Sequence, residues 1–105
     1  MGVIKGVLKE ELENSLRMKS GYERELGKLP KGSLVKKKVK GHEYYYLLSR
    51  EHGKVKFVYK GKVSEEEIKK YREAKEYRAK YRKLLSHVKK QIRFLGSALR
   101  GKESV

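Results

Sequence analysis

The sequence predicts an α+β fold in which a helix, a three-stranded antiparallel β-meander and a long helix follow one another. Two observations predict the helices: apolar residues recur at helical spacing over residues 3–27 and again over residues 65–99. A third predicts the sheet, because glycine-containing turns divide residues 33–61 into short runs rich in β-forming residues. At 105 residues the chain has the size of one domain, so we expect a single domain over residues 1–105.

The first helix is predicted over residues 3–27. Its apolar residues repeat every four positions, at Ile4, Leu8, Leu12 and Leu16. Pro30 follows the segment and favours a helix stop. The segment carries five basic and five acidic side chains, so it is a candidate scaffold rather than a polyanion-binding element.

Three strands are predicted at residues 33–40, 43–51 and 54–60. Gly41-His42 is a two-residue connection of the kind that type II′ turns use, and His52-Gly53 suits a type I′ turn. Pairing across these turns places Val39 opposite Tyr44, Lys37 opposite Tyr46, Tyr46 opposite Tyr59, and Leu48 between Val35 and Phe57.

This register divides the sheet into two faces. We expect one face to pack on a helix as the core, with Val35, Val39, Tyr44, Tyr46, Leu48, Val55, Phe57 and Tyr59. The other face carries Lys36, Lys38, Lys40, Tyr45, Leu47, Lys54, Lys56, Val58 and Lys60. A slip of one residue would exchange the two faces.

The lysine-rich face is the leading candidate for a binding site. The chain has 29 Lys and Arg against 13 acidic residues, a net charge of +16, and residues 28–62 hold eleven basic side chains against two acidic ones. A field of this sign and size attracts nucleic acid. The same lysines would also keep a solvated sheet from pairing edge to edge. The nucleic-acid-binding residues predicted on this face are Lys36, Lys38, Lys40, Tyr45, Lys54, Lys56 and Lys60, with Tyr45 placed to stack on a base or bond a phosphate.

The last helix is predicted over residues 65–99, beginning with a capping box formed by Ser64 and Glu67. Its apolar stripe has one polar step, Arg78, and comprises Ile68, Tyr71, Ala74, Tyr81, Leu85, Val88, Ile92, Leu95 and Leu99. A helix of about 50 Å is longer than the meander can cover. The seam over residues 81–99 must therefore pack on the first helix or on another chain, and we expect a homodimer through this helix.

The same helix is a second candidate binding surface. Nine basic residues and no acidic one occur between Tyr77 and Lys102, and the contacts predicted here are Arg82, Lys89, Lys90 and Arg93. The stretch also has the pattern of an amphipathic membrane-surface helix. The helical seam accounts for its apolar residues more simply, so a membrane is not the expected partner.

The composition argues against an enzyme, a metal centre or a cofactor. The chain has no Cys and no Asp, and its three His residues show no ligand spacing. No nucleophile, base and orienting group can be assigned together, so we expect no catalytic residues, no metal site and no cofactor. With no long apolar run or signal sequence, a cytoplasmic location is expected, and enrichment in Lys and Glu favours a thermophilic prokaryote.

Residues 29–68 carry a recognisable pattern. Its parts are Gly32-Ser33-Leu34, Lys40-Gly41, Tyr44-Tyr45-Tyr46-Leu47, Gly53-Lys54 and Tyr59-Lys60-Gly61-Lys62, followed by a long charged helix. This segment resembles an uncharacterised family of small prokaryotic proteins, and the resemblance implies no particular activity. The predicted sheet is also similar to the three-stranded basic sheets of arm-type DNA-binding domains, a likeness at the level of the fold.

Together these features predict a nucleic-acid-binding protein that contacts mainly phosphates, with DNA favoured over RNA and a transcriptional or mobile-element role. The alternative is a structural protein that forms a helical dimer and uses its sheet to bind an acidic protein. Salt-dependent binding to DNA distinguishes the two, because only the first makes it the main activity.

Overall fold

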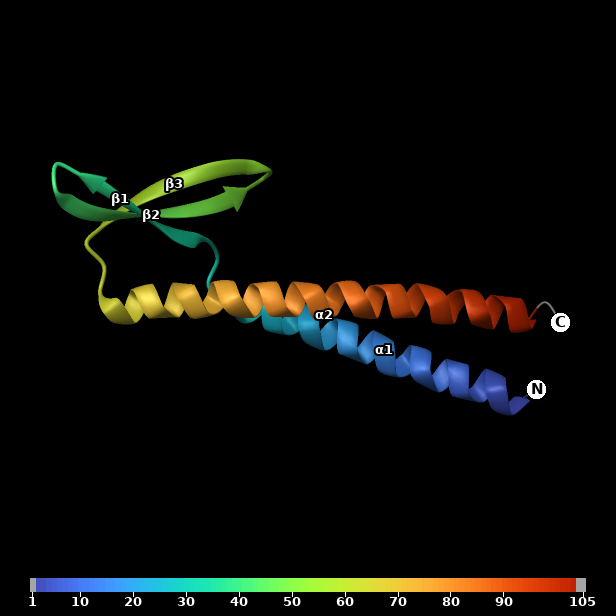
Figure 1. Cartoon of the computed structure of the whole chain (residues 1–105). Helices are drawn as coiled ribbons and strands as arrows, with labels where there is room; N and C mark the ends of the chain where they lie inside the picture. Colours follow the sequence, from blue (N-terminus) through green and yellow to red (C-terminus); the bar gives the residue numbers. More distant parts are fainter. Residues whose placement is uncertain (1, 104–105) are drawn as a thin grey trace. The chain divides into compact units, whose positions relative to one another are not determined.

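The computed structural model describes residues 2–103 and confirms the α+β class and the expected order of elements (Figure 1). The elements are α1 (Gly2–Lys28), β1 (Ser33–Val39), β2 (His42–Glu51), β3 (Lys54–Gly61) and α2 (Glu65–Glu103). The chain divides into two compact units. The helical unit consists of α1 with α2 from Ala79 onward, and the sheet unit is Leu29–Arg78. The single domain expected over residues 1–105 stays a prediction.

In the helical unit, α2 turns its apolar seam inward. Val88, Leu95 and Leu99 are buried, and the half-buried ring of Tyr81 lies 6.1 Å from that of Tyr22 in α1. The alternating spacing of three and four residues keeps these positions on one side of a helix. The seam is thus covered by α1 of the same chain, which is one of the two arrangements that the sequence left open.

The inward stripe of α1 differs from the expected one. Ile4 and Leu16 are 48% and 44% exposed, whereas Ser15 is buried at 2%. Residues four apart drift roughly 40° around a helix of 3.6 residues per turn, so a strict four-residue repeat leaves the buried face. The observed stripe alternates steps of four and three, through Leu8, Leu12, Ser15, Lys19, Tyr22 and Leu26.

Ser15 occupies the tightest position of α1. With Tyr22 beside Tyr81, antiparallel pairing brings Ser15 to the level of Val88, and each of these two residues is 2% exposed. A small side chain at this level allows the two helix backbones to approach, since helix separation depends on the side chains at the contact. The sequence pattern passed over Ser15 because it is polar.

The sheet has the order β1-β2-β3, and the expected pairing is right for one hairpin only. Between β2 and β3, Tyr46 pairs with Tyr59 and Leu48 with Phe57, as predicted. Between β1 and β2 the register differs by two residues, with Val39 opposite His42 rather than Tyr44.

The turn chemistry explains this difference. Lys40 and Gly41 have φ angles of 52° and 81°, so both central residues have positive φ, as a type I′ turn requires. The turn is therefore Lys40-Gly41, and the expected type II′ turn at Gly41-His42 is wrong. A shift of two residues preserves the alternation of side chains, so the two predicted faces keep their members.

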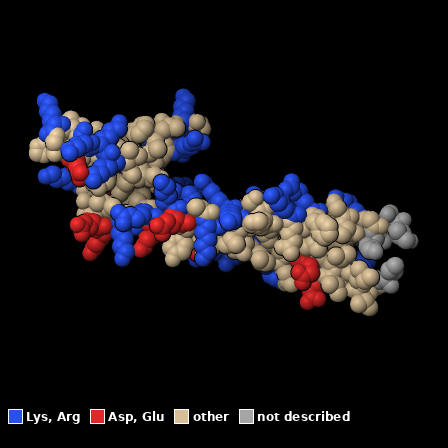
Figure 2. All heavy atoms as spheres, in the orientation of Figure 1, with Lys and Arg blue, Asp and Glu red and all other residues tan. Residues whose placement is uncertain are grey.

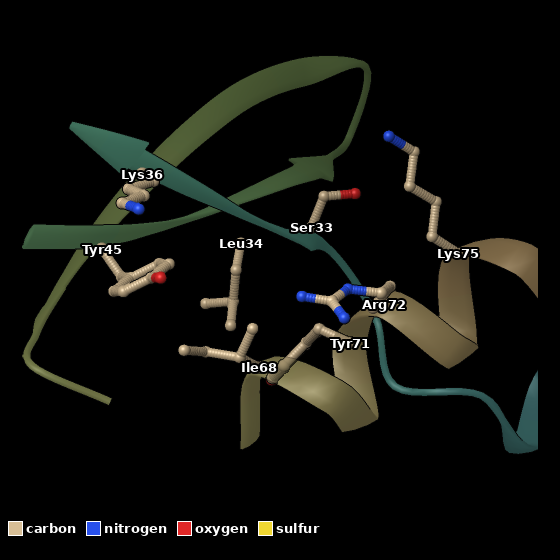
Figure 3. A pocket seen from close by; sticks show the side chains of 8 residues that line it. All are labelled: Ser33, Leu34, Lys36, Tyr45, Ile68, Tyr71, Arg72 and Lys75. Atoms are coloured by element: carbon tan, nitrogen blue, oxygen red, sulfur yellow. The ribbon is translucent and has the colours of Figure 1, made fainter. Parts of the chain in front are cut away.

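The expectation of which face forms the core is wrong. Val55, Phe57 and Tyr59 are 53%, 54% and 59% exposed. The first turns of α2 lie instead on the other face, where Leu34 and Tyr45 share a pocket with Ile68 and Tyr71 (Figure 3). Strand alternation separates two faces but does not determine which one the next helix covers. We call the uncovered side, with His42, Tyr44, Tyr46, Phe57 and Tyr59, the aromatic face.

Two local features hold the start of α2 and the linker before β1. The Glu67 amide donates to Ser64 Oγ at 3.2 Å, which confirms Ser64 as the helix cap. Arg78, the polar step of the predicted stripe, donates to the carbonyl of Pro30 at 2.6 Å and to that of Gly32 at 3.5 Å. The guanidinium thus fixes the linker that leads into β1.

We expect Leu95→Ala to lower the free energy of unfolding by about 2–5 kcal/mol, because it leaves a cavity in the helical unit. Leu16→Ala is the matched control and should cost much less, since Leu16 is already 44% exposed. Urea unfolding followed by circular dichroism measures both. Equal losses in the free energy of unfolding would contradict a buried face of α1 that includes Ser15 and leaves Leu16 exposed.

Arg78→Gln should destabilise the protein by about 1.5–3 kcal/mol, the usual range for a charged hydrogen bond to a carbonyl. Arg82→Gln removes the same charge from an exposed position of α2 and should leave the melting temperature nearly unchanged. Thermal unfolding of the two variants tests whether the hydrogen bonds of Arg78 stabilise the linker. If both variants melt like the wild type, this role of Arg78 is refuted.

Candidate nucleic-acid interface

A pocket of about 340 Å³ lies in the sheet unit between β1, β2 and the first part of α2 (Figure 3). Its lining residues are Ser33, Leu34, Lys36, Tyr45, Ile68, Tyr71, Arg72 and Lys75. They combine an aliphatic pair, two phenol rings, a hydroxyl and three cations, and none of them is acidic. Such a lining suits a planar ring that is joined to a negatively charged group.

The pocket contains two of the predicted site residues, Lys36 and Tyr45, and three side chains that the sequence analysis missed. Tyr71, Arg72 and Lys75 were overlooked because residues 64–76 hold five Glu against four basic residues, which hides their local charge. A signal was nevertheless present, since residues three and four positions apart on a helix share one face with Ile68. The acidic residues of this segment lie outside the pocket lining.

Two of the predicted lysines are held by carboxylates of β2. Lys36 Nζ lies 3.0 Å from Glu43, and Lys56 Nζ lies 3.8 Å from Glu51. The hydrogen bond to the Glu43 carboxylate, together with its charge, raises the pKa of Lys36 above its usual value. All four side chains are more than half exposed, so each pair is a weak surface interaction that a stronger anion can displace.

Apart from Lys36, the lysines predicted for this face form two groups at opposite ends of the sheet. Lys38, Lys40 and Lys60 lie toward the β1–β2 turn, whereas Lys54 lies with Lys56 beside the β2–β3 turn. All five are exposed. The structure thus divides the predicted lysine-rich face into two clusters, with the α2-covered pocket between them.

The helical unit brings together part of the second predicted surface. Arg82, Lys89, Lys90 and Arg93 are all exposed on α2. An open pocket of about 340 Å³ is lined by Lys89, Ile92 and Arg93 with Lys19 of α1. Lys19, which sequence reasoning did not select, also lies 3.8 Å from Glu23. Figure 2 shows more Lys and Arg than acidic side chains on the visible surfaces of both the sheet and the helices.

Within residues 2–103 no group of three or more His, Cys, Asp or Glu side chains is arranged to hold a metal ion. No helix in the described part of the chain combines the length and apolar character needed to cross a bilayer.

Comparison with known proteins gives one family match. Residues 7–70 match the family described as Domain of unknown function (DUF6788). This range covers most of α1, the whole sheet and the start of α2, including Lys36, Tyr45 and Ile68 of the pocket. Searches of curated proteins and of solved structures gave no match.

Proposed function

The chain belongs to the DUF6788 family, a domain of unknown function, and we propose that it binds nucleic acid mainly through phosphate groups. The observation that carries the proposal is the pocket that Lys36, Arg72 and Lys75 line together with two phenol rings, with no carboxylate in the lining. Basic side chains neutralise phosphates and release their condensed counterions, and hydroxyl groups bond to phosphate oxygens. Aromatic rings beside them offer a surface on which a base stacks.

The charge distribution extends this surface beyond the pocket. No acidic residue occurs between Tyr77 and Lys102, and the exposed cations of α2 repel one another unless a polyanion relieves them. Lys19, Lys89 and Arg93 around one open pocket are a second point of phosphate contact. The proposal includes both surfaces, and neither requires a catalytic residue.

We extend the proposal to DNA in preference to RNA, and to a transcriptional or mobile-element role in the cytoplasm of a thermophilic prokaryote. The support for DNA is the similarity of the sheet to arm-type DNA-binding sheets, and the support for the source is the Lys- and Glu-rich composition.

A second candidate is a structural protein that dimerises through its helices and binds an acidic protein. One observation favours dimerisation: Val3, Val7 and Phe94 of the helical unit are 82%, 53% and 69% exposed. The seam itself is covered by α1, so such a dimer would use these outward residues. Light scattering together with salt-dependent DNA binding distinguishes this candidate from the first.

Replacing Lys36, Arg72 and Lys75 together by Gln should weaken duplex DNA binding and flatten the slope of log affinity against log salt. Each lost phosphate contact removes about 0.9 units of slope, so about 2–3 units are expected. Fluorescence anisotropy at rising salt measures the slope.

The matched control replaces Lys31, Lys62 and Lys70 by Gln, which lowers the net charge by the same amount at exposed positions outside the pocket. It should change the slope by less than about one unit. If the pocket variant keeps the wild-type slope while replacement of Arg82, Lys89 and Arg93 flattens it, the helical unit is the binding surface and the role of the pocket is wrong.

Glu43→Gln with Glu51→Gln should strengthen binding a few-fold at low salt, because these carboxylates compete with phosphate for Lys36 and Lys56. Glu10→Gln with Glu11→Gln makes the same change in net charge on α1 and should have a smaller effect. Anisotropy titrations compare the two double variants, and equal gains would assign the effect to net charge alone.

A further inference from the structure

The aromatic face carries a continuous set of rings on β2 and β3. The ring of Tyr59 lies 6.2 Å from that of Tyr44 and 5.3 Å from that of Tyr46, and His42 lies 6.3 Å from Tyr44. Phe57 is joined to the set through Lys37 of β1, whose amine lies 5.2 Å from the centre of Tyr46 and 5.5 Å from that of Phe57. The rings and the cation thus form one surface across all three strands.

This surface is open to solvent. Phe57 and Tyr59 are 54% and 59% exposed, and Val39 and Val55 beside them are 49% and 53% exposed. Exposed apolar side chains that gather on one face of a small protein often mark a binding surface. The strands could instead have carried lysines here, as they do on the opposite face.

The charges on the aromatic face have a single sign. Alternation along the strands places Lys37 and Arg50 on this face, whereas Glu43 and Glu51, the acidic residues of the three strands, lie on the opposite face. An occupant must therefore offer flat apolar surfaces to the rings and negative charge to Lys37. Unpaired nucleobases joined by phosphates have both properties, whereas a second copy of this chain would bring another Lys37 to the interface.

We propose that the aromatic face binds the unpaired bases of single-stranded nucleic acid by stacking. This inference rests on the proposed function. It adds that the nucleic acid is single-stranded and that the aromatic face distinguishes a single strand from a duplex. In a duplex the bases are stacked on one another and present only their edges, so these rings cannot reach a base plane. A single strand exposes its base planes, and stacking on aromatic side chains is tolerant of sequence.

The test compares Phe57→Ala with Tyr59→Ala, singly and together, for binding to oligo-dT and to a duplex of equal length. Each ring should be worth about five-fold to 150-fold in affinity for the single strand, with little change in salt slope, because stacking releases no cations. Duplex affinity should stay within about two-fold of the wild type, since no ring of the aromatic face contacts the duplex. Tyrosine fluorescence, which no Trp masks in this chain, should be quenched by oligo-dT.

Phe94→Ala is the matched control, because it removes an even more exposed ring, at 69%, from the helical unit. It should leave affinity for oligo-dT unchanged. Circular dichroism of every variant checks that the sheet is retained. We expect it to be retained because the substituted side chains are exposed.

Three outcomes would overturn the inference. Unchanged affinity of the double variant for oligo-dT, with duplex binding retained, refutes the aromatic face and leaves the proposed function standing. A wild-type dimer that becomes a monomer on Phe57→Ala shows that a second copy covers this face. Absence of binding to either nucleic acid at low salt refutes the proposed function and this inference together.

Discussion

Two tight turns, each formed by two residues with positive φ, determine which side chains share a face of the sheet. Lys40-Gly41 and His52-Gly53 both adopt this geometry, whose twist matches that of the flanking strands. Glycine adopts it without strain, whereas Lys40 and His52 are held in a conformation that non-glycine residues seldom take. Because side chains alternate along a strand, these two turns separate the rings from most of the lysines, and both proposed binding modes depend on that separation.

The separation also distributes the acidic residues. Glu43 and Glu51 share a face with Lys36 and Lys56 and pair with them, so part of the lysine-rich face is neutralised within the chain. Exposed pairs of this kind contribute little to stability and are screened by salt. In the proposed function their effect is mainly on binding, since a phosphate would have to displace a carboxylate before it reached either lysine. No strand carboxylate competes in this way on the aromatic face.

The sequence was sufficient for the order of the elements and for their boundaries within four residues. It was also sufficient for the β2–β3 register from Glu51 back to Tyr46 and for the face on which each strand residue lies, although Lys40 belongs to the turn. The misplaced turn at Gly41-His42 shifted the β1–β2 register by two residues. Because side chains alternate with a period of two, the assignment of strand residues to faces did not change. What could not be predicted from local sequence was which face α2 covers, since this depends on residues far apart in the chain, such as Leu34 and Ile68, which line one pocket. The pocket cations Arg72 and Lys75 were missed for a related reason. The net charge of a segment does not show that a helix places its basic and acidic residues on different faces.

The edge strand β1 connects the two proposed modes of contact. Its consecutive lysines Lys36, Lys37 and Lys38 point alternately to the two faces, so this edge of the sheet is cationic on both sides. Charged side chains on an edge strand prevent pairing with another sheet, which keeps the edge free for a different ligand. A single strand whose phosphates follow β1 meets Lys36 beside the pocket and Lys37 beside the rings. Phosphate contact on the edge would then position the bases over the aromatic face, and recognition would depend on base exposure more than on base identity.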